Sequence, residues 1–97
     1  MLVNLSMSKI VLLLMTKKGF AVLDSLIKNG LKDFIELVIS YEEKGVIENY
    51  YKLIEGLCIN NNIKFYNKNE INLSSLDDNY YYIAIGWKWI VNKKNIF

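Results

Sequence analysis

The sequence predicts an α/β fold in which a mostly parallel sheet of about four strands carries helices on its faces. Short apolar segments typical of strands alternate with stretches of helical spacing, an order that favours parallel strands joined by right-handed crossovers. No linker, repeat or low-complexity block divides the 97 residues, and a chain of this length builds one domain. We therefore expect a single domain over residues 1–97. Residues 1–7 are expected to be a disordered or non-native start, because the strand pattern begins only at Lys9.

Four segments have strand character, at residues 9–15, 34–41, 63–66 and 80–86. The first, KIVLLLM, is almost continuously apolar, which is typical of a strand buried on both faces. The last, YYYIAIG, combines β-branched and aromatic residues and suits the centre of a sheet. A polar connection over residues 67–79 precedes that last strand.

Two segments have helical spacing. In residues 20–30 one helix face carries Phe20, Leu23, Leu26 and Ile27, and Asn29-Gly30 is a stop signal. The second helix is expected from Val46 to about Asn60. The resulting order, β-α-β-α-β-loop-β, predicts one Rossmann-like half with three layers.

Composition excludes several classes of function. The chain is 53% apolar and 23% charged, as in globular proteins. Its basic residues are all lysines with a net charge of only +2, and the absence of arginine disfavours nucleic-acid binding. A single cysteine, Cys58, and no histidine exclude an internal disulfide and the usual zinc sites, so no metal is expected.

The longest early apolar run, residues 10–15, is far shorter than the roughly 20 residues that span a bilayer. No small-residue cleavage site follows it, so we expect no signal peptide and no membrane association. A cytoplasmic location is the expectation.

The first candidate site lies where the first strand meets the first helix, at Thr16, Lys17, Lys18 and Gly19. This junction belongs to the carboxyl edge of a parallel sheet, where helix N-termini often hold anions. Two lysines and a glycine suit a phosphate, although neither a dinucleotide fingerprint nor a P-loop is present. The alternative is a pair of solvated lysines at a helix start.

Ser40 and Tyr41 end the second strand at the same edge, followed by Glu42 and Glu43. An acid at this point accepts ribose hydroxyls in dinucleotide-binding folds. The alternative is a solvated turn.

The most informative cluster is Trp87, Lys88 and Trp89. On a strand the two indoles share one side, where they would line a flat space for a ring. Two alternatives stay open: an interface that covers an exposed sheet edge, and ordinary core. Cys58, on an apolar helix face, is interpreted as a small buried hydrophobe, and the pair Asp77-Asp78 as part of a turn.

The order of motifs KIVLLLMTKKGFAVLDSLIKNG, IELVISYEEKG, NNIKFYNKNEIN and YYYIAIGWKWIV resembles the N-terminal half of formyltransferase-fold enzymes, which include methionyl-tRNA and sugar N-formyltransferases. The resemblance covers about residues 8–91. The family's catalytic Asn, the His of an Asn-x-His motif and an Asp come later in the chain, so no catalytic residue is carried over to this sequence. The resemblance implies the fold and a remnant of the binding crevice, with folate or a nucleotide as ligand only if that crevice survives.

We therefore expect a small non-catalytic binding or interaction protein, a homo-oligomer in which a partner chain covers the sheet edge opened by truncation. Its ligand is expected to be an anionic, nucleotide-like small molecule or a protein, as in a phage-type inhibitor. The alternative is the N-terminal piece of a split formyltransferase that needs a separate catalytic half. The candidate ligand-binding residues are Thr16, Lys17, Lys18, Gly19, Ser40, Tyr41, Trp87, Lys88 and Trp89.

Overall fold

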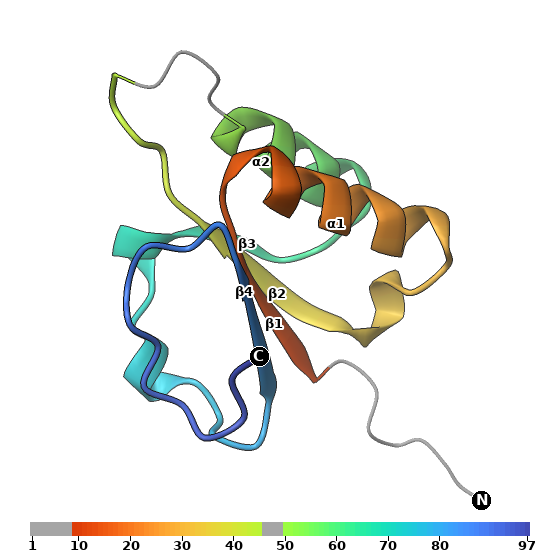
Figure 1. Ribbon diagram of the computed structural model, residues 1–97. Coiled ribbons are helices and arrows are strands. Elements are labelled where there is room, and N and C mark those ends of the chain that lie inside the picture. The colour runs from red at the N-terminus through yellow and green to blue at the C-terminus, as the bar shows by residue number, and fades with distance from the viewer. Residues whose placement is uncertain (1–8, 46–49) are drawn as a thin grey trace, which may run out of the picture.

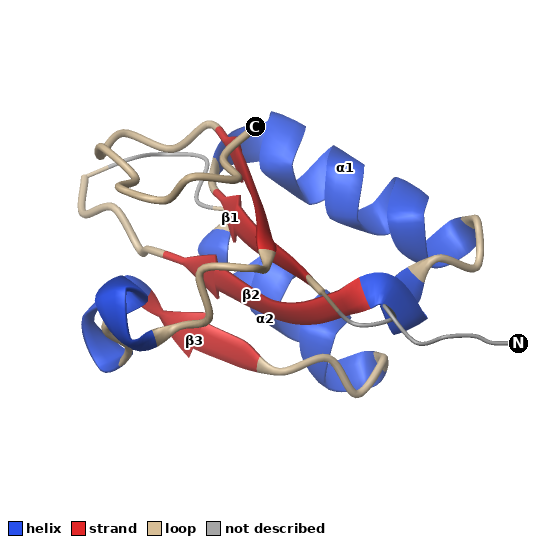
Figure 2. Ribbon diagram, turned by 90° about the horizontal axis from the view of Figure 1, so that it is seen from below, coloured by secondary structure: helices blue, strands red, loops and turns tan. Residues whose placement is uncertain are grey.

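The computed structural model describes residues 9–45 and 50–97 and confirms the predicted fold class (Figure 1). Its four strands are β1 (Ile10–Leu14), β2 (Ile35–Ser40), β3 (Phe65–Asn67) and β4 (Tyr81–Ile85). They form one sheet in the order β3-β2-β1-β4, and every pair is parallel (Figure 2). The α-helices are α1 (Thr16–Lys28) and α2 (Tyr51–Asn60), and the 3-10 turns are η1 (Lys32–Phe34), η2 (Lys68–Glu70) and η3 (Leu73–Ser75).

Most element boundaries agree with the sequence to within two residues, and the start of α1 is the main difference. Residues 16–19, expected to be a loop, form the first turn of this helix. The chain turns directly from β1 into α1, with Met15 extended at the N-cap and Gly19 close against Leu14. A Cβ at Gly19 would lie 3.0 Å from the Leu14 Cβ, so glycine permits this close turn. The expected second-helix start at Val46 lies outside the described residues, as does the expected start of the chain at residues 1–7.

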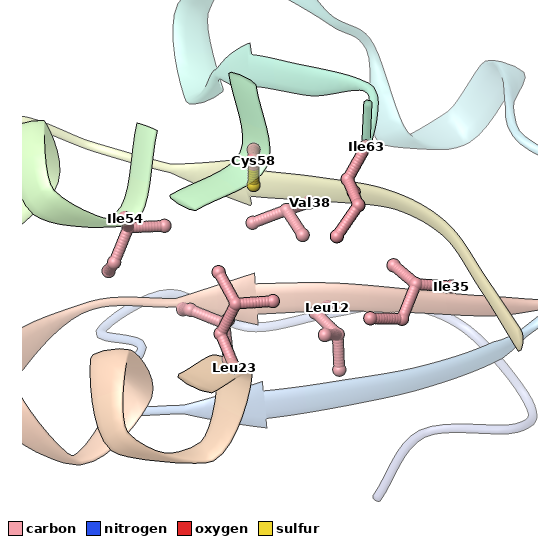
Figure 3. Packing of buried hydrophobic residues seen from close by; sticks show 8 residues of the cluster. Leu12, Leu23, Ile35, Val38, Ile54, Cys58 and Ile63 are labelled. Carbon is pink, nitrogen blue, oxygen red and sulfur yellow. The ribbon is translucent and has the colours of Figure 1, made fainter. Parts of the chain in front are cut away.

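Both α-helices cover the same face of the sheet (Figure 1). There, Leu23 of α1 and Ile54 and Cys58 of α2 meet side chains of β1 and β2 in a buried cluster, with Leu12 and Val38 at its centre (Figure 3). Because β1 and β2 are buried on both faces, their side chains supply both halves of the core.

The opposite face is covered by 3-10 turns and irregular chain. From β1 to β3 the sheet grows in one direction, and the chain then returns past β1 to form β4. The connection from β3 to β4 crosses the sheet in the opposite direction, so a right-handed crossover passes over the face that the helices leave open. Figure 1 shows the connection on that face. Its side chains Ile71, Leu73 and Leu76 pack against the buried residues on that face of the sheet, which include Leu13 and Ile39. The third layer of the fold is therefore built from turns and coil.

A buried lysine and a buried tyrosine fasten this irregular layer. The Lys93 side chain is 3% exposed and donates to the backbone oxygen of Leu76 at 2.8 Å and to a carboxylate oxygen of Asp78 at 3.0 Å. The Tyr82 hydroxyl donates to the backbone oxygen of Asp77 at 2.7 Å. The connection before β4 and the segment after it are thus held together and to the sheet.

The outer edge of β4 is paired by the chain itself. The amide N–H groups of Tyr82 and Ala84 donate to the backbone oxygens of Asn95 and Phe97, and the N–H of Phe97 donates to Tyr82. The bridge between Tyr82 and Ile96 is parallel. These residues occupy the edge at which a partner chain was expected to pair.

Candidate functional site at the carboxyl edge of the sheet

The ends of all four strands converge on one edge of the sheet, because the strands are parallel. Thr16, Tyr41, Lys68 and Gly86 each follow one of the strands. The order of the strands reverses at β1, which lies between β2 and β4. In open α/β sheets, ligands bind outside the carboxyl ends of strands at such a reversal. The fold therefore predicts a ligand site at this edge.

The turns after β1 and β4 are in direct contact. Gly86 has φ +68°, and a Cβ there would lie 2.5 Å from the backbone oxygen of Met15 and 2.6 Å from Oγ1 of Thr16. Thr16 itself has φ 68°, which is unusual for a β-branched residue and costs on the order of 1–3 kcal/mol. Backbone contact thus closes the space between these two strand ends.

Three aromatic rings and one ammonium group meet where β2, β3 and β4 end, and we name Tyr41, Lys68, Trp87 and Trp89 the aromatic–lysine cluster. The Trp87 and Trp89 ring centroids are 5.2 Å apart, and those of Tyr41 and Trp89 are 5.3 Å apart. The Lys68 ammonium lies 4.5 Å from the Trp89 centroid and 5.9 Å from that of Tyr41. These are attractive cation–π distances.

The two indoles contact each other edge to face, with 71° between their planes. The flat space expected between them is therefore absent, since each ring fills the position beside the other. Residues 86–89 also lie beyond the end of β4 and do not continue the strand.

A hollow of about 180 Å³ adjoins the cluster on the irregular face of the sheet. Its lining consists of Ile39, Lys68, Ile71, Asn72, Leu73 and Trp87. Lys68 and Trp87 thus belong to both the cluster and the hollow. The arrangement offers an apolar space with a cation at its rim.

The two lysines near this edge, Lys68 and Lys88, differ in whether they form an ion pair. Lys88 forms an ion pair with Glu43, which joins the turn after β4 to the turn after β2. Lys68, by contrast, has no carboxylate partner within residues 9–45 and 50–97. Its ammonium contacts aromatic rings instead, so within those residues its positive charge stays uncompensated.

The remaining candidate residues are placed elsewhere. Lys17 and Lys18 are exposed on the first turn of α1, and no ion pair or cation–π contact in the described part of the chain joins them to the cluster. Lys17 lines a different hollow of about 420 Å³ beside Phe20 and Tyr50. Ser40 is fully buried, and its hydroxyl has no hydrogen-bond partner in the described part of the chain.

Lys68 was missed by the reasoning from sequence. The apolar pattern ends the third strand at residue 66 and leaves Lys68 in a polar connection, whereas β3 ends at Asn67 and Lys68 follows it directly. The rule applied to the other strands, that residues just after a parallel strand reach the same edge, would have found it.

Two structural interpretations are confirmed. Cys58 is fully buried, and burial, with a smaller contribution from Glu55, raises the pKa of its thiol to about 12. Asp77 forms the predicted turn, because its carboxylate accepts the amide N–H of Asn79 at 2.9 Å.

The fold and site define a small α/β protein with a polar and aromatic edge. No protein-family model matches the chain, and the comparisons with curated proteins and with solved structures found no match either. The resemblance to formyltransferase-fold enzymes is untested by these comparisons and stays a prediction.

Two further observations concern metals and membranes. Over residues 9–45 and 50–97, no three His, Cys, Asp or Glu side chains gather closely enough to hold a metal ion. Across the same residues, neither helix has the length and apolar character needed to cross a membrane.

Proposed function

We propose that this protein is a non-catalytic binding protein that holds a small anionic molecule at the carboxyl edge of its sheet. The observation that carries the proposal is Lys68, whose ammonium is fixed over Trp89 and has no carboxylate partner in the described part of the chain. A positive charge held in place without a counter-ion attracts an anion more strongly than a paired one does.

The position of the cluster supports the proposal. It lies at the carboxyl edge of the parallel sheet, where β2, β3 and β4 end, next to a hollow with apolar walls. Small-molecule sites combine such walls with a few placed polar groups. Trp87 packs against the hydrophobic core, and Lys88 forms an ion pair with Glu43. Because both side chains are already held in place, binding a ligand costs little conformational entropy there.

The test is thermal unfolding in the presence of nucleotides, sugar phosphates and carboxylic acids, since a ligand that binds only the folded state raises Tm. We expect at least one of these anion classes to raise the Tm of the wild type and not of Lys68→Met. Lys94→Met is the matched control, because it removes the same charge from an exposed lysine outside the hollow. If no class raises the wild-type Tm, or if both variants respond alike, the proposal is wrong.

A second candidate function is self-association, and exposed apolar side chains beside the cluster favour it. Ile90 is 95% exposed and Trp89 37% exposed, and apolar side chains grouped on a surface often mark contact sites. Native mass spectrometry would detect the oligomer. We expect Ile90→Ser to dissociate it while leaving the Lys68-dependent rise in Tm unchanged. A wild type that is monomeric at all concentrations would exclude this candidate.

A further inference from the structure

We infer that the hollow beside the cluster takes a carboxylate carried on a single ring, such as a benzoate-like acid, rather than a whole nucleotide. This inference rests on the proposed function and narrows its ligand. Three features of the hollow carry it: its volume, its lining and its hydrogen-bond donors.

The volume of the hollow limits the ligand to about one ring. It is about 180 Å³, and an apolar cavity of about 150 Å³ holds benzene. Pockets for larger ligands, including nucleotides, start at roughly 300 Å³. A base together with its sugar and phosphate would therefore extend well outside the hollow.

The lining is suited to a ring. Ile39 is buried, and Ile71 and Leu73 are half-buried residues packed against the hydrophobic core on the same face of the sheet. Trp87 adds an indole, which packs well against another aromatic ring. A sugar or a bare phosphate would leave its polar groups against these apolar walls without partners.

Two side chains that can donate hydrogen bonds line the hollow, and a carboxylate has two oxygens to accept them. Lys68 supplies an ammonium without a counter-ion in the described part of the chain. Asn72 also lines the hollow, and its side-chain oxygen already accepts the backbone N–H of Ser74 at 3.0 Å and the Ser74 hydroxyl at 2.8 Å. The amide nitrogen of Asn72 is therefore the part left to donate to a ligand. A single uncompensated cation balances a monoanion better than a phosphate dianion.

The experiment compares benzoate, benzyl alcohol and adenosine monophosphate as probes, followed by the fluorescence of Trp87 and Trp89, which are the only tryptophans. We expect benzoate to bind more tightly than either of the others. Lys68→Met should weaken benzoate binding by about tenfold or more, because it removes a charge-assisted hydrogen bond. It should leave the weak binding of benzyl alcohol unchanged, and Lys94→Met should change neither. Circular dichroism would show that each variant is folded.

The outcomes separate this inference from the proposed function. If adenosine monophosphate binds through Lys68 and benzoate does not, the single-ring inference is overturned and the proposed function stands. Equal affinity for benzoate and benzyl alcohol would show that the ligand's carboxylate gains nothing from Lys68, which would overturn the inference. If no anion, including those in the unfolding experiment, binds through Lys68, both proposals fail.

Discussion

Replacing Gly86 by alanine should destabilise the protein more than any other glycine-to-alanine change among the described glycines. The left-handed φ of +68° costs about 1 kcal/mol for a residue with a Cβ. The new Cβ would also lie 2.5 Å from the Met15 oxygen and 2.6 Å from the Thr16 hydroxyl. Relieving such overlap by shifting packed atoms costs about 1–3 kcal/mol. We expect a total loss of about 2–4 kcal/mol, out of the roughly 5–15 kcal/mol that stabilises a typical domain.

Two other glycines supply matched controls. Gly30 has φ +74°, but a Cβ added there would meet no atom within 4 Å, so Gly30→Ala isolates the backbone contribution of about 1 kcal/mol. Gly56 lies within α2 with open space around it, and Gly56→Ala should stabilise by about 0.5–1 kcal/mol. The difference between the Gly86 and Gly30 variants then measures the steric contact between the two turns.

The assay is urea unfolding followed by tryptophan fluorescence and circular dichroism, with the free energy of unfolding extrapolated to water. Both tryptophans follow Gly86 closely in sequence, so the fluorescence also reports on the site. A Gly86→Ala variant that loses no more stability than Gly30→Ala would refute the argument that the turns after β1 and β4 are in close contact.

Three further predictions concern buried groups. The Cys58 thiol, with its pKa of about 12, should resist iodoacetamide at mildly alkaline pH in the folded protein and react on addition of urea; equal rates in both states would contradict its burial. Burial raises the pKa of Tyr82. Burial lowers the pKa of Lys93, but interactions with Asp78 and Tyr82 together outweigh this effect and raise it. Both side chains therefore bind their protons more tightly in the folded protein than in the unfolded chain. Their contribution to the free energy of unfolding is complete below the ordinary pKa values, 10.0 for Tyr82 and 10.5 for Lys93, and is lost as the pH rises through the raised pKa values of the folded protein. Urea midpoints measured across this range should fall, and Tyr82→Phe should reduce the fall while removing about 1 kcal/mol at neutral pH. Ser40→Ala should keep or raise the free energy of unfolding, since it removes a buried hydroxyl without a partner in the described chain; a loss above about 1 kcal/mol would reveal a hidden hydrogen bond.

The sheet was predictable because its two central strands, β1 and β2, are strongly apolar. Residues 10–14 are all apolar, which is typical of a strand buried on both faces. The helical spacing of residues 20–27 predicts a helix that packs on this strand. The first turn of α1 was missed by the reasoning from sequence because Thr16 and the two lysines after it are residue types common in loops. The close contact of Gly19 with Leu14 allows the helix to begin immediately after the strand.

The site was only partly predictable for a related reason. Tyr41, Trp87 and Trp89 follow strands that the sequence located well, and they do meet. Lys68 follows a strand of only three residues, too short for its end to be placed by pattern alone. The edge-to-face contact of the indoles follows a turn at Gly86 that lies close to Met15, a residue far from it in the sequence, so strand patterns alone do not place it.

The pairing of residues 95–97 along β4 has a practical consequence for labelling. Because this pairing is parallel, Phe97 lies beside Ala84, two positions before the turn at Gly86. A fluorophore attached to the side chain at position 97 would therefore lie beside the last residues of β4, the strand that leads to Trp87 and Trp89. Such a group could report on ligand arrival by energy transfer from the nearby indoles, and it could equally obstruct binding. Binding experiments should therefore use protein that is unmodified at position 97, and a labelled form should serve only as a proximity probe.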